Sequence, residues 1–281
     1  MPEFATPEPI TATLDVLAGH VRIGASDRTD TVVDVQPSDP SREQDVRAAE
    51  QTSVDFSSGT LLIRTPRGRS FILHGRTGSV DVAVELPAGS NVQVDVSAGS
   101  VQAQGRLGAS RVKTSAGDIR LDETGQADLR TDAGAIVVDR VAGKADITTG
   151  SGRIHVGSID GDAVLKNSNG DNWVGAITGE LRVKAANGNV TVDHAAASVT
   201  ANTANGSVLI GDVVRGTAAL STAMGQIEVG IHQGTAARLD VSTQFGRVRN
   251  DLDTADRPAS TDETVDIQAR TSYGDVVIRR A

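Results

Sequence analysis

Apolar and polar residues alternate along most of this chain, in short segments separated by glycine-containing turns. The segment 165–211 shows the pattern most regularly, because its Asn-Gly steps recur every 18 residues, at Asn169-Gly170, Asn187-Gly188 and Asn205-Gly206. A period of two places alternate side chains on one face, so both flanks of each step predict β-strands with one buried face. No repeat carries the apolar spacing of an amphipathic helix.

The glycine of this step marks a column that extends well beyond the central segment, and its spacing stays at 17–19 residues until two longer intervals near the C-terminus. Its members are Gly99, Gly117, Gly134, Gly152, Gly170, Gly188, Gly206, Gly225, Gly246 and Gly274. Aliphatic residues dominate the positions five before, two after and four after the glycine. Threonine dominates the position three before it, at Thr114, Thr131, Thr149, Thr203, Thr222, Thr243 and Thr271.

Two architectures account for such a repeat. Asn-Gly between alternating apolar residues is a strong hairpin signal, so a chain of β-hairpins is one interpretation. We favour a β-solenoid, because stacking of each repeat on its equivalent explains why every column keeps one residue type. The predicted fold is therefore all-β, a single-stranded β-helix with about 18 residues per coil, in which Val183 lies between Leu165 and Ala201.

One residue interrupts the buried columns. Asn172 stands two positions after its glycine, where other repeats have Val or Ile. A buried amide without partners would be costly. We therefore predict a local change of register that moves Trp173 or Val174 into the inner position.

The regions flanking the repeats predict a cap and an insertion. Residues 1–85 predict a β-rich N-terminal cap region continuous with the solenoid of residues 86–281, and Gly19 in the segment 17–24 resembles a repeat glycine. Solenoids need protected ends. We expect Arg279 and Arg280 to discourage stacking at the C-terminal end. The acidic, proline-containing segment 251–263 predicts a solvated loop.

Two charged segments are less regular. Residues 41–52, with Ser41 as a candidate N-cap and Gln44 three residues later, predict either a helix or an irregular excursion. The second segment is a basic group, which consists of Arg64, Arg67, Arg69 and Arg76. We interpret it as solvated surface charge, and binding of an anion or of an acidic partner is the alternative.

Composition narrows the range of functions. Aromatic residues make up 2% of the chain, which suits a narrow interior of small and β-branched side chains. The absence of cysteine excludes disulfides and thiolate metal sites. A net charge of −9 disfavours nucleic acid or an anionic membrane as the main partner. No signal peptide and no apolar stretch of membrane-spanning length stand out, so we expect a cytoplasmic protein.

Catalytic chemistry leaves little trace in the sequence. The five histidines, His20, His74, His155, His194 and His232, lack metal-ligand spacing, and we expect His155 to face solvent. No nucleophile or phosphate-binding motif is present. We therefore assign no catalytic, cofactor-binding or metal-binding residue and expect no cofactor. A bulky stripe of Met224, Phe245 and Tyr273, one position before the glycine, predicts packing beneath the 251–263 loop, with a docking patch as the alternative.

The repeats resemble a known bacterial family. The segments 80–105 (VDVAVELPAGSNVQVDVSAGSVQAQG), 112–125 (VKTSAGDIRLDETG), 129–143 (LRTDAGAIVVDRVAG) and 147–161 (ITTGSGRIHVGSIDG) are similar to β-strand-repeat "putative adhesins" of unknown function. The resemblance covers nearly the whole chain and implies a right-handed single-stranded β-helix. It supplies no catalytic motif to transfer.

Three hypotheses for function follow. The first is a non-enzymatic β-solenoid scaffold or interaction module that binds protein partners, with homo-oligomers allowed. The second is an adhesin-like binder of carbohydrates or surfaces. The third is a self-assembling filament that resembles the bactofilins.

Overall fold

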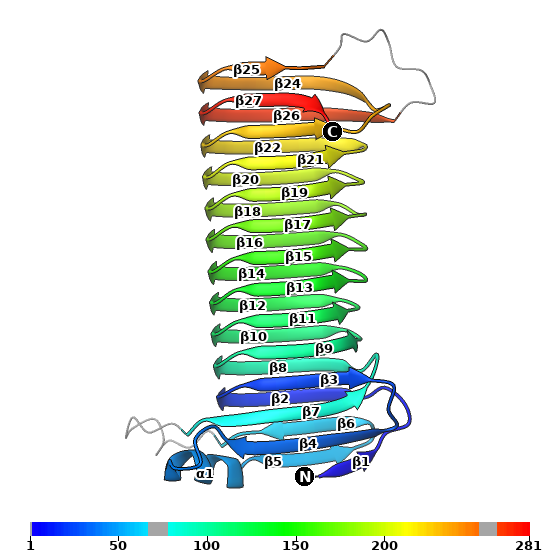
Figure 1. Cartoon of the computed structure of the whole chain (residues 1–281), viewed down its shortest axis with the longest axis vertical. Helices are drawn as coiled ribbons and strands as arrows, with labels where there is room; N and C mark the ends of the chain where they lie inside the picture. Colours follow the sequence, from blue (N-terminus) through cyan, green and yellow to red (C-terminus); the bar gives the residue numbers. More distant parts are fainter. Residues whose placement is uncertain (1, 67–77, 253–262) are drawn as a thin grey trace. The chain divides into compact units, whose positions relative to one another are not determined.

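The computed structural model describes residues 2–66, 78–252 and 263–281. It divides into two compact units, residues 1–140 and 141–281. In both units, the strands of the repeats alternate between two facing sheets, and each repeat strand pairs in parallel with its equivalent in the neighbouring coil (Figure 1). Among the described residues, no helix is long and apolar enough to cross a membrane.

Unit 1 contains one helix and thirteen strands within its described residues. They are β1 (Glu3–Ala5), β2 (Thr11–Ala18), β3 (Val21–Ser26), β4 (Asp30–Pro37), α1 (Glu43–Glu50), β5 (Ser53–Ser57), β6 (Thr60–Arg64), β7 (Val80–Pro87), β8 (Asn91–Ala98), β9 (Val101–Leu107), β10 (Ser110–Ala116), β11 (Ile119–Thr124), β12 (Ala127–Ala133) and β13 (Ile136–Val141). One sheet has the order β1-β4-β7-β3-β9-β11-β13, and the other has the order β12-β10-β8-β2-β6-β5.

The N-terminal strands of unit 1 join the repeat and also close its outer side. β2 pairs with β8 and β3 pairs with β9, both in parallel, and Gly19 has a φ of +128° like the repeat glycines. Beyond this coil, β4 pairs antiparallel with β7, and β5 pairs antiparallel with β6. The antiparallel strands end the parallel stacking. The predicted division at residue 85 stays a prediction.

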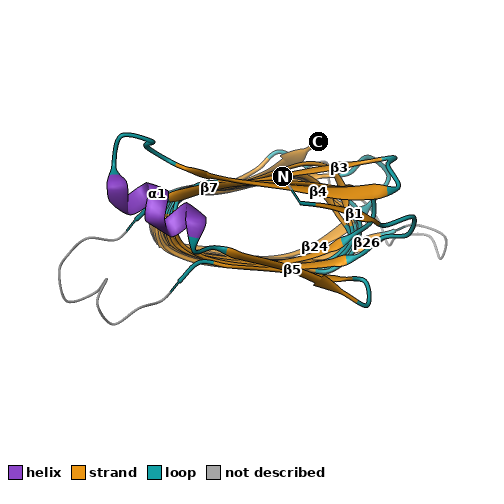
Figure 2. Cartoon of the chain, turned by 90° about the horizontal axis from the view of Figure 1, so that it is seen from below, coloured by secondary structure: helices purple, strands orange, loops and turns teal. Residues whose placement is uncertain are grey.

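The segment 41–52 does form a helix, α1, which packs beside β4 and β7 (Figure 2). The predicted cap is wrong, because Arg42 occupies the N-cap and makes no side-chain capping bond. The helix is fixed by Asp45, which is buried and whose Oδ1 accepts a hydrogen bond from the Ser79 backbone N–H at 3.0 Å. Of the basic group, Arg67, Arg69 and Arg76 lie outside the described residues.

Unit 2 continues the same pattern in its described residues. Its strands are β14 (Ala145–Ser151), β15 (Ile154–Ile159), β16 (Ala163–Asn169), β17 (Asn172–Ile177), β18 (Leu181–Asn187), β19 (Val190–Ala195), β20 (Val199–Asn205), β21 (Val208–Val213), β22 (Gly216–Met224), β23 (Ile227–Ile231), β24 (Ala236–Phe245), β25 (Val248–Asn250), β26 (Thr264–Tyr273) and β27 (Val276–Arg280). The sheet orders are β15-β17-β19-β21-β23-β27-β25 and β24-β26-β22-β20-β18-β16-β14.

The register confirms the predicted 18-residue coil. Val183 pairs with Leu165 on one side and with Ala201 on the other, and all three are at most 1% exposed. The strands on the two sides of an Asn-Gly step belong to different sheets, so the hairpin interpretation is wrong. Each coil instead buries a thin aliphatic interior between the sheets, which is the main source of stability in such repeats.

The threonine column has a defined role that the sequence pattern alone does not reveal. Thr222 Oγ1 donates a hydrogen bond to the Gly206 carbonyl oxygen at 2.8 Å, so each buried hydroxyl satisfies the corner glycine of the neighbouring coil. The same bond recurs at Thr114, Thr131, Thr203 and Thr271, with distances of 3.0–3.2 Å. Buried hydroxyls and carbonyls are costly without partners, so these bonds remove a penalty at each coil that has the threonine.

The corner glycines are required for two reasons. Gly188 has a φ of +136°, in a region that L side chains rarely adopt. A Cβ at Gly188 would also clash with the Gly170 carbonyl oxygen. The column thus allows the backbones of successive corners to stack closely.

Asn172 stays in register, contrary to the predicted register change. It pairs with Ile154 and with Val190, and it is 2% exposed. Asn167 replaces the column threonine in the same coil, and its Nδ2 donates to the Gly152 carbonyl at 2.9 Å and to Asn172 Oδ1 at 3.2 Å. Asn172 Oδ1 thus has a donor inside the coil, and Asn172 Nδ2 donates to the Gly170 carbonyl at 3.3 Å, so the amide is accommodated without a change of register.

The order of the last coils differs from their order in the sequence. β26 pairs with β22 on one side and with β24 on the other, and β27 likewise lies between β23 and β25. The coil of residues 264–280 is therefore interior, and residues 236–250 form the outermost coil of unit 2. This corrects the expectation that Arg279 and Arg280 protect a terminal edge. Arg279 instead pairs with Glu228 at 2.8 Å.

Candidate functional site

The bulky stripe is the most prominent apolar feature on the surface of unit 2. Met224, Tyr273 and Phe245 lie on three adjacent strands, because Tyr273 pairs with Met224 on β22 and with Phe245 on β24. Their side chains are 55%, 56% and 62% exposed, respectively. The rings of Phe245 and Tyr273 stack, with centroids 4.8 Å apart. We call these three residues the apolar stripe.

The apolar stripe continues a polar column. Asn169, Asn187 and Asn205 stand at the same position of the preceding coils, and Asn205 pairs with Met224. Their amides form a ladder, in which Asn187 Nδ2 donates to Asn169 Oδ1 at 2.9 Å and Asn205 Nδ2 donates to Asn187 Oδ1 at 2.8 Å. A ladder of paired amides holds this corner in a fixed geometry beside the apolar stripe.

Exposure of large apolar side chains is concentrated in this part of the described structure. Besides the apolar stripe, Val248 of the outermost coil is 45% exposed, whereas Val276 at the same position of the next coil is fully buried. The packing predicted beneath the 251–263 loop stays a prediction, because residues 253–262 of that loop lie outside the described residues. A contiguous exposed apolar patch is typical of an interaction surface.

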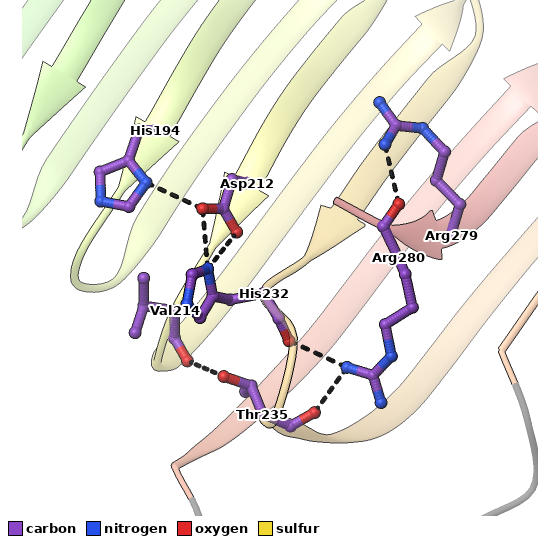
Figure 3. A network of polar contacts seen from close by, with 7 residues as sticks. All are labelled: His194, Asp212, Val214, His232, Thr235, Arg279 and Arg280. Atoms are coloured by element: carbon purple, nitrogen blue, oxygen red, sulfur yellow. Dashed lines mark hydrogen bonds and ion pairs between the residues drawn. The ribbon is translucent and has the colours of Figure 1, made fainter.

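A second polar group lies at another corner of unit 2, and the sequence pattern did not lead us to predict it. Asp212 Oδ2 is 2.9 Å from His194 Nδ1 and 2.9 Å from His232 Nδ1 (Figure 3). His194 and Asp212 are register partners on β19 and β21, while His232 follows β23. The signal was available, because His194 and Asp212 both stand six residues after a column glycine.

The geometry of this corner fits a structural role. A carboxylate that accepts a hydrogen bond from each imidazole requires a proton on both Nδ1 atoms. Next to it, Arg280 Nη1 donates to the carbonyls of His232 and Thr235, and Thr235 Oγ1 donates to Val214 O. These bonds hold the turn between β23 and β24. Among the described residues, no group of three His, Cys, Asp or Glu side chains could hold a metal ion.

His155 is exposed, as predicted, and it stacks on Trp173 with ring centroids 4.0 Å apart. Trp173 thus packs against its register partner on the adjacent strand β15 and is not part of the apolar stripe. A groove of about 460 Å³ lies along the starts of β22, β24 and β26, where Arg215 and Glu263 form an ion pair of 3.4 Å. Its described lining contains no aromatic ring, which sugar-binding grooves commonly use.

These features define an all-β repeat protein, a β-solenoid with a patterned surface. The family model Toastrack DUF4097 matches residues 18–171, more than half of the chain, so the chain belongs to this family. The predicted membership in a β-strand-repeat family of unknown function is thereby confirmed. Among proteins with curated descriptions, none matches the sequence.

Several solved structures are similar over the full chain. A putative cell adhesion protein from Clostridium sporogenes ATCC 15579 has 9% identity and a TM-score of 0.23, and covers 100% of this chain and 99% of its own. Putative adhesins from Parabacteroides distasonis ATCC 8503 and Parabacteroides merdae ATCC 43184 have 11% and 13% identity and TM-scores of 0.36. Each covers 100% of this chain and 95% of its own. At these scores the similarity carries no functional argument.

Proposed function

We propose that this chain is a non-catalytic interaction module and that a protein partner binds the apolar stripe. The observation that supports the proposal is the position of Met224, Tyr273 and Phe245 on three paired strands, each more than half exposed. Aromatic residues and methionine are enriched at protein interfaces. Rigid strands present them with little loss of conformational entropy on binding.

The experiment places a photo-crosslinking amino acid at Tyr273 in the full chain, expressed in its native host. We expect a crosslinked protein that is absent when the same amino acid replaces Arg182, an exposed residue of β18. Phe245→Ser should remove the crosslink while circular dichroism still shows a folded β-protein. Equal crosslinking from both positions, or none from Tyr273, would overturn the proposal. The cytoplasmic location stays a prediction, which cell fractionation tests.

A carbohydrate binder is the second candidate, and one observation favours it. The amide ladder of Asn187 and Asn205 leads directly to the stacked rings of Tyr273 and Phe245. Sugars combine hydroxyl groups, which bind amides, with apolar ring faces, which pack on aromatic side chains. A glycan array probed with the full chain tests this candidate. Binding that Tyr273→Ala abolishes would support it, and an array without signal would exclude it for the glycans displayed.

A further inference from the structure

The outermost coil of unit 2 presents a long strand edge without a strand partner among the described residues. β24 has ten residues and pairs only with β26, and it ends its sheet (Figure 1). In unit 1 the outermost strands β1 and β5 have three and five residues and pair antiparallel. Long unpaired edges invite pairing with another chain, so natural proteins usually shorten or block them.

The backbone of β24 has free hydrogen-bonding groups at defined residues. The Ala236 N–H donates to the Glu263 carbonyl at 2.9 Å, so this residue faces β26. Since successive residues of a strand point their N–H and C=O to opposite sides, Ala237, Leu239 and Val241 direct theirs away from β26. The free edge therefore carries donors and acceptors that suit a further strand.

The interior of this coil is also incompletely covered. Leu239 and Val241 occupy inner positions but are partly exposed, whereas their register partners Ile267 and Ala269 on β26 are fully buried. A strand added at this edge would therefore bury apolar side chains as well as satisfy backbone groups.

The charges on the outer face of β24 indicate which strand fits. Arg238 and Asp240 are both exposed and point to the same face, two residues apart, and Asp240 also forms an exposed ion pair of 3.1 Å with Arg270 of β26. If two β24 strands pair antiparallel with Leu239 opposite Leu239, each Arg238 lies opposite Asp240 of the other copy. Moving the centre to Asp240 would oppose two aspartates, and moving it to Val241 would leave both charges opposite neutral residues. Opposite charges across a strand pair are favourable and like charges are unfavourable.

We propose that two copies of this chain associate through β24, in an antiparallel pair centred on Leu239. Ala237 of one copy then bonds with Val241 of the other, and the inner side chains of both coils face each other across the junction. This two-fold contact is isologous and closes at two copies. It uses the strand edge and leaves the apolar stripe outward, so it goes beyond the proposed function and does not depend on it.

Sedimentation equilibrium of the full chain tests the proposal, with concentrations from about 1 μM to 1 mM to cover ordinary dimer affinities. We expect a monomer–dimer equilibrium. Arg238→Asp and Asp240→Arg should each weaken the dimer by about tenfold or more, because each places like charges opposite one another at two positions. The double variant R238D/D240R should associate more tightly than either single variant, since the charges across the strand pair are again complementary, although the ion pair between Asp240 and Arg270 within the chain is lost.

Arg182→Asp is the matched control, because it makes the same charge change on an exposed position of β18 that lies away from the edge. It should leave association unchanged. A monomer throughout the range, open-ended assemblies, equal weakening by R182D and R238D, or no recovery in the double variant would each overturn the proposal. Tyr273→Ser should leave the dimer intact, so the outcome is separate from that of the crosslinking experiment.

Discussion

Phe245 stacks on Tyr273, with ring planes 9° apart, although the strand of Tyr273 comes later in the chain and lies further inside the stack. The final coil of the sequence is thus inserted between two coils that precede it. This order makes the C-terminal residues part of the interior and leaves residues 236–250 as the outermost coil.

Engineered disulfides test this order cleanly, because the chain has no native cysteine. Ser221 is the register partner of Arg270, and Arg270 is the partner of Ser242. Paired residues on adjacent strands lie within disulfide range, whereas residues two strands apart do not. We expect S221C/R270C to oxidise fully and S221C/S242C to stay reduced, as measured by mass spectrometry after thiol labelling. The reverse result would place residues 236–250 directly on β22.

The corner glycines predict a large loss of stability on substitution. Gly188→Ala combines an unfavourable φ with a clash against the Gly170 carbonyl, so we expect a loss of at least about 2 kcal/mol in urea unfolding. Gly234→Ala is the control, since Gly234 also has positive φ, of +84°, but no atom lies within 4 Å of its added Cβ. Equal losses for the two variants would contradict the role of close corner stacking.

The buried amide pair predicts a gain in stability when the repeat pattern is restored. Asn167 Oδ1 is buried without a hydrogen-bond partner among the described residues. In N167T/N172V, the threonine can keep the bond to the Gly152 carbonyl, and valine refills the aliphatic column. We expect stabilisation of about 1–2 kcal/mol. Asn167→Ala should destabilise the fold, because the Gly152 carbonyl loses that donor. A less stable double variant would show that the amide pair is favourable in itself.

An ion pair in unit 1 predicts a dependence of stability on acid. The Arg28 guanidinium, which donates from Nε and Nη2 to both oxygens of Asp30, lowers the pKa of that carboxyl from its usual value. The ion pair therefore stabilises the fold above the unfolded pKa, and this contribution is lost as the pH falls through the lower folded pKa.

Asp30→Asn should remove this part of the acid dependence, measured by urea unfolding between about pH 5 and pH 2. Arg28→Ala should remove the same part, and the double variant should add nothing further. A pH profile of Asp30→Asn that parallels the wild type would show that this pair does not contribute.

Much of the fold could be predicted because each column has one physical requirement. The glycine at the corner and the aliphatic positions around it specify register, and the pairing of Val183 follows from them. Asn172 was predicted wrongly because its partner, Asn167, stands at a different position of the repeat, so reading Asn172 as a lone exception hid the pair. A column pattern describes residues one at a time and does not show which exceptions compensate each other.

The order of the last coils and the polar corner could not be obtained in the same way. Residues 236–250 and 264–280 both carry the repeat pattern, so either could be outermost by sequence alone. His232 approaches Asp212 because β21 and β23 shift register between Ile210 and Val213. Local irregularities of this kind depend on packing across the coils and leave no periodic signal.

The central claim is that the strands flanking each Asn-Gly step belong to different sheets and stack on the neighbouring coils. Lys166 and Lys184 are register partners one coil apart. In a hairpin about Asn169-Gly170, Lys166 would instead oppose Trp173. Disulfide formation in K166C/K184C and in K166C/W173C, with the fold checked by circular dichroism, decides between the two. We predict complete oxidation of K166C/K184C alone, and a disulfide in K166C/W173C alone would contradict the solenoid.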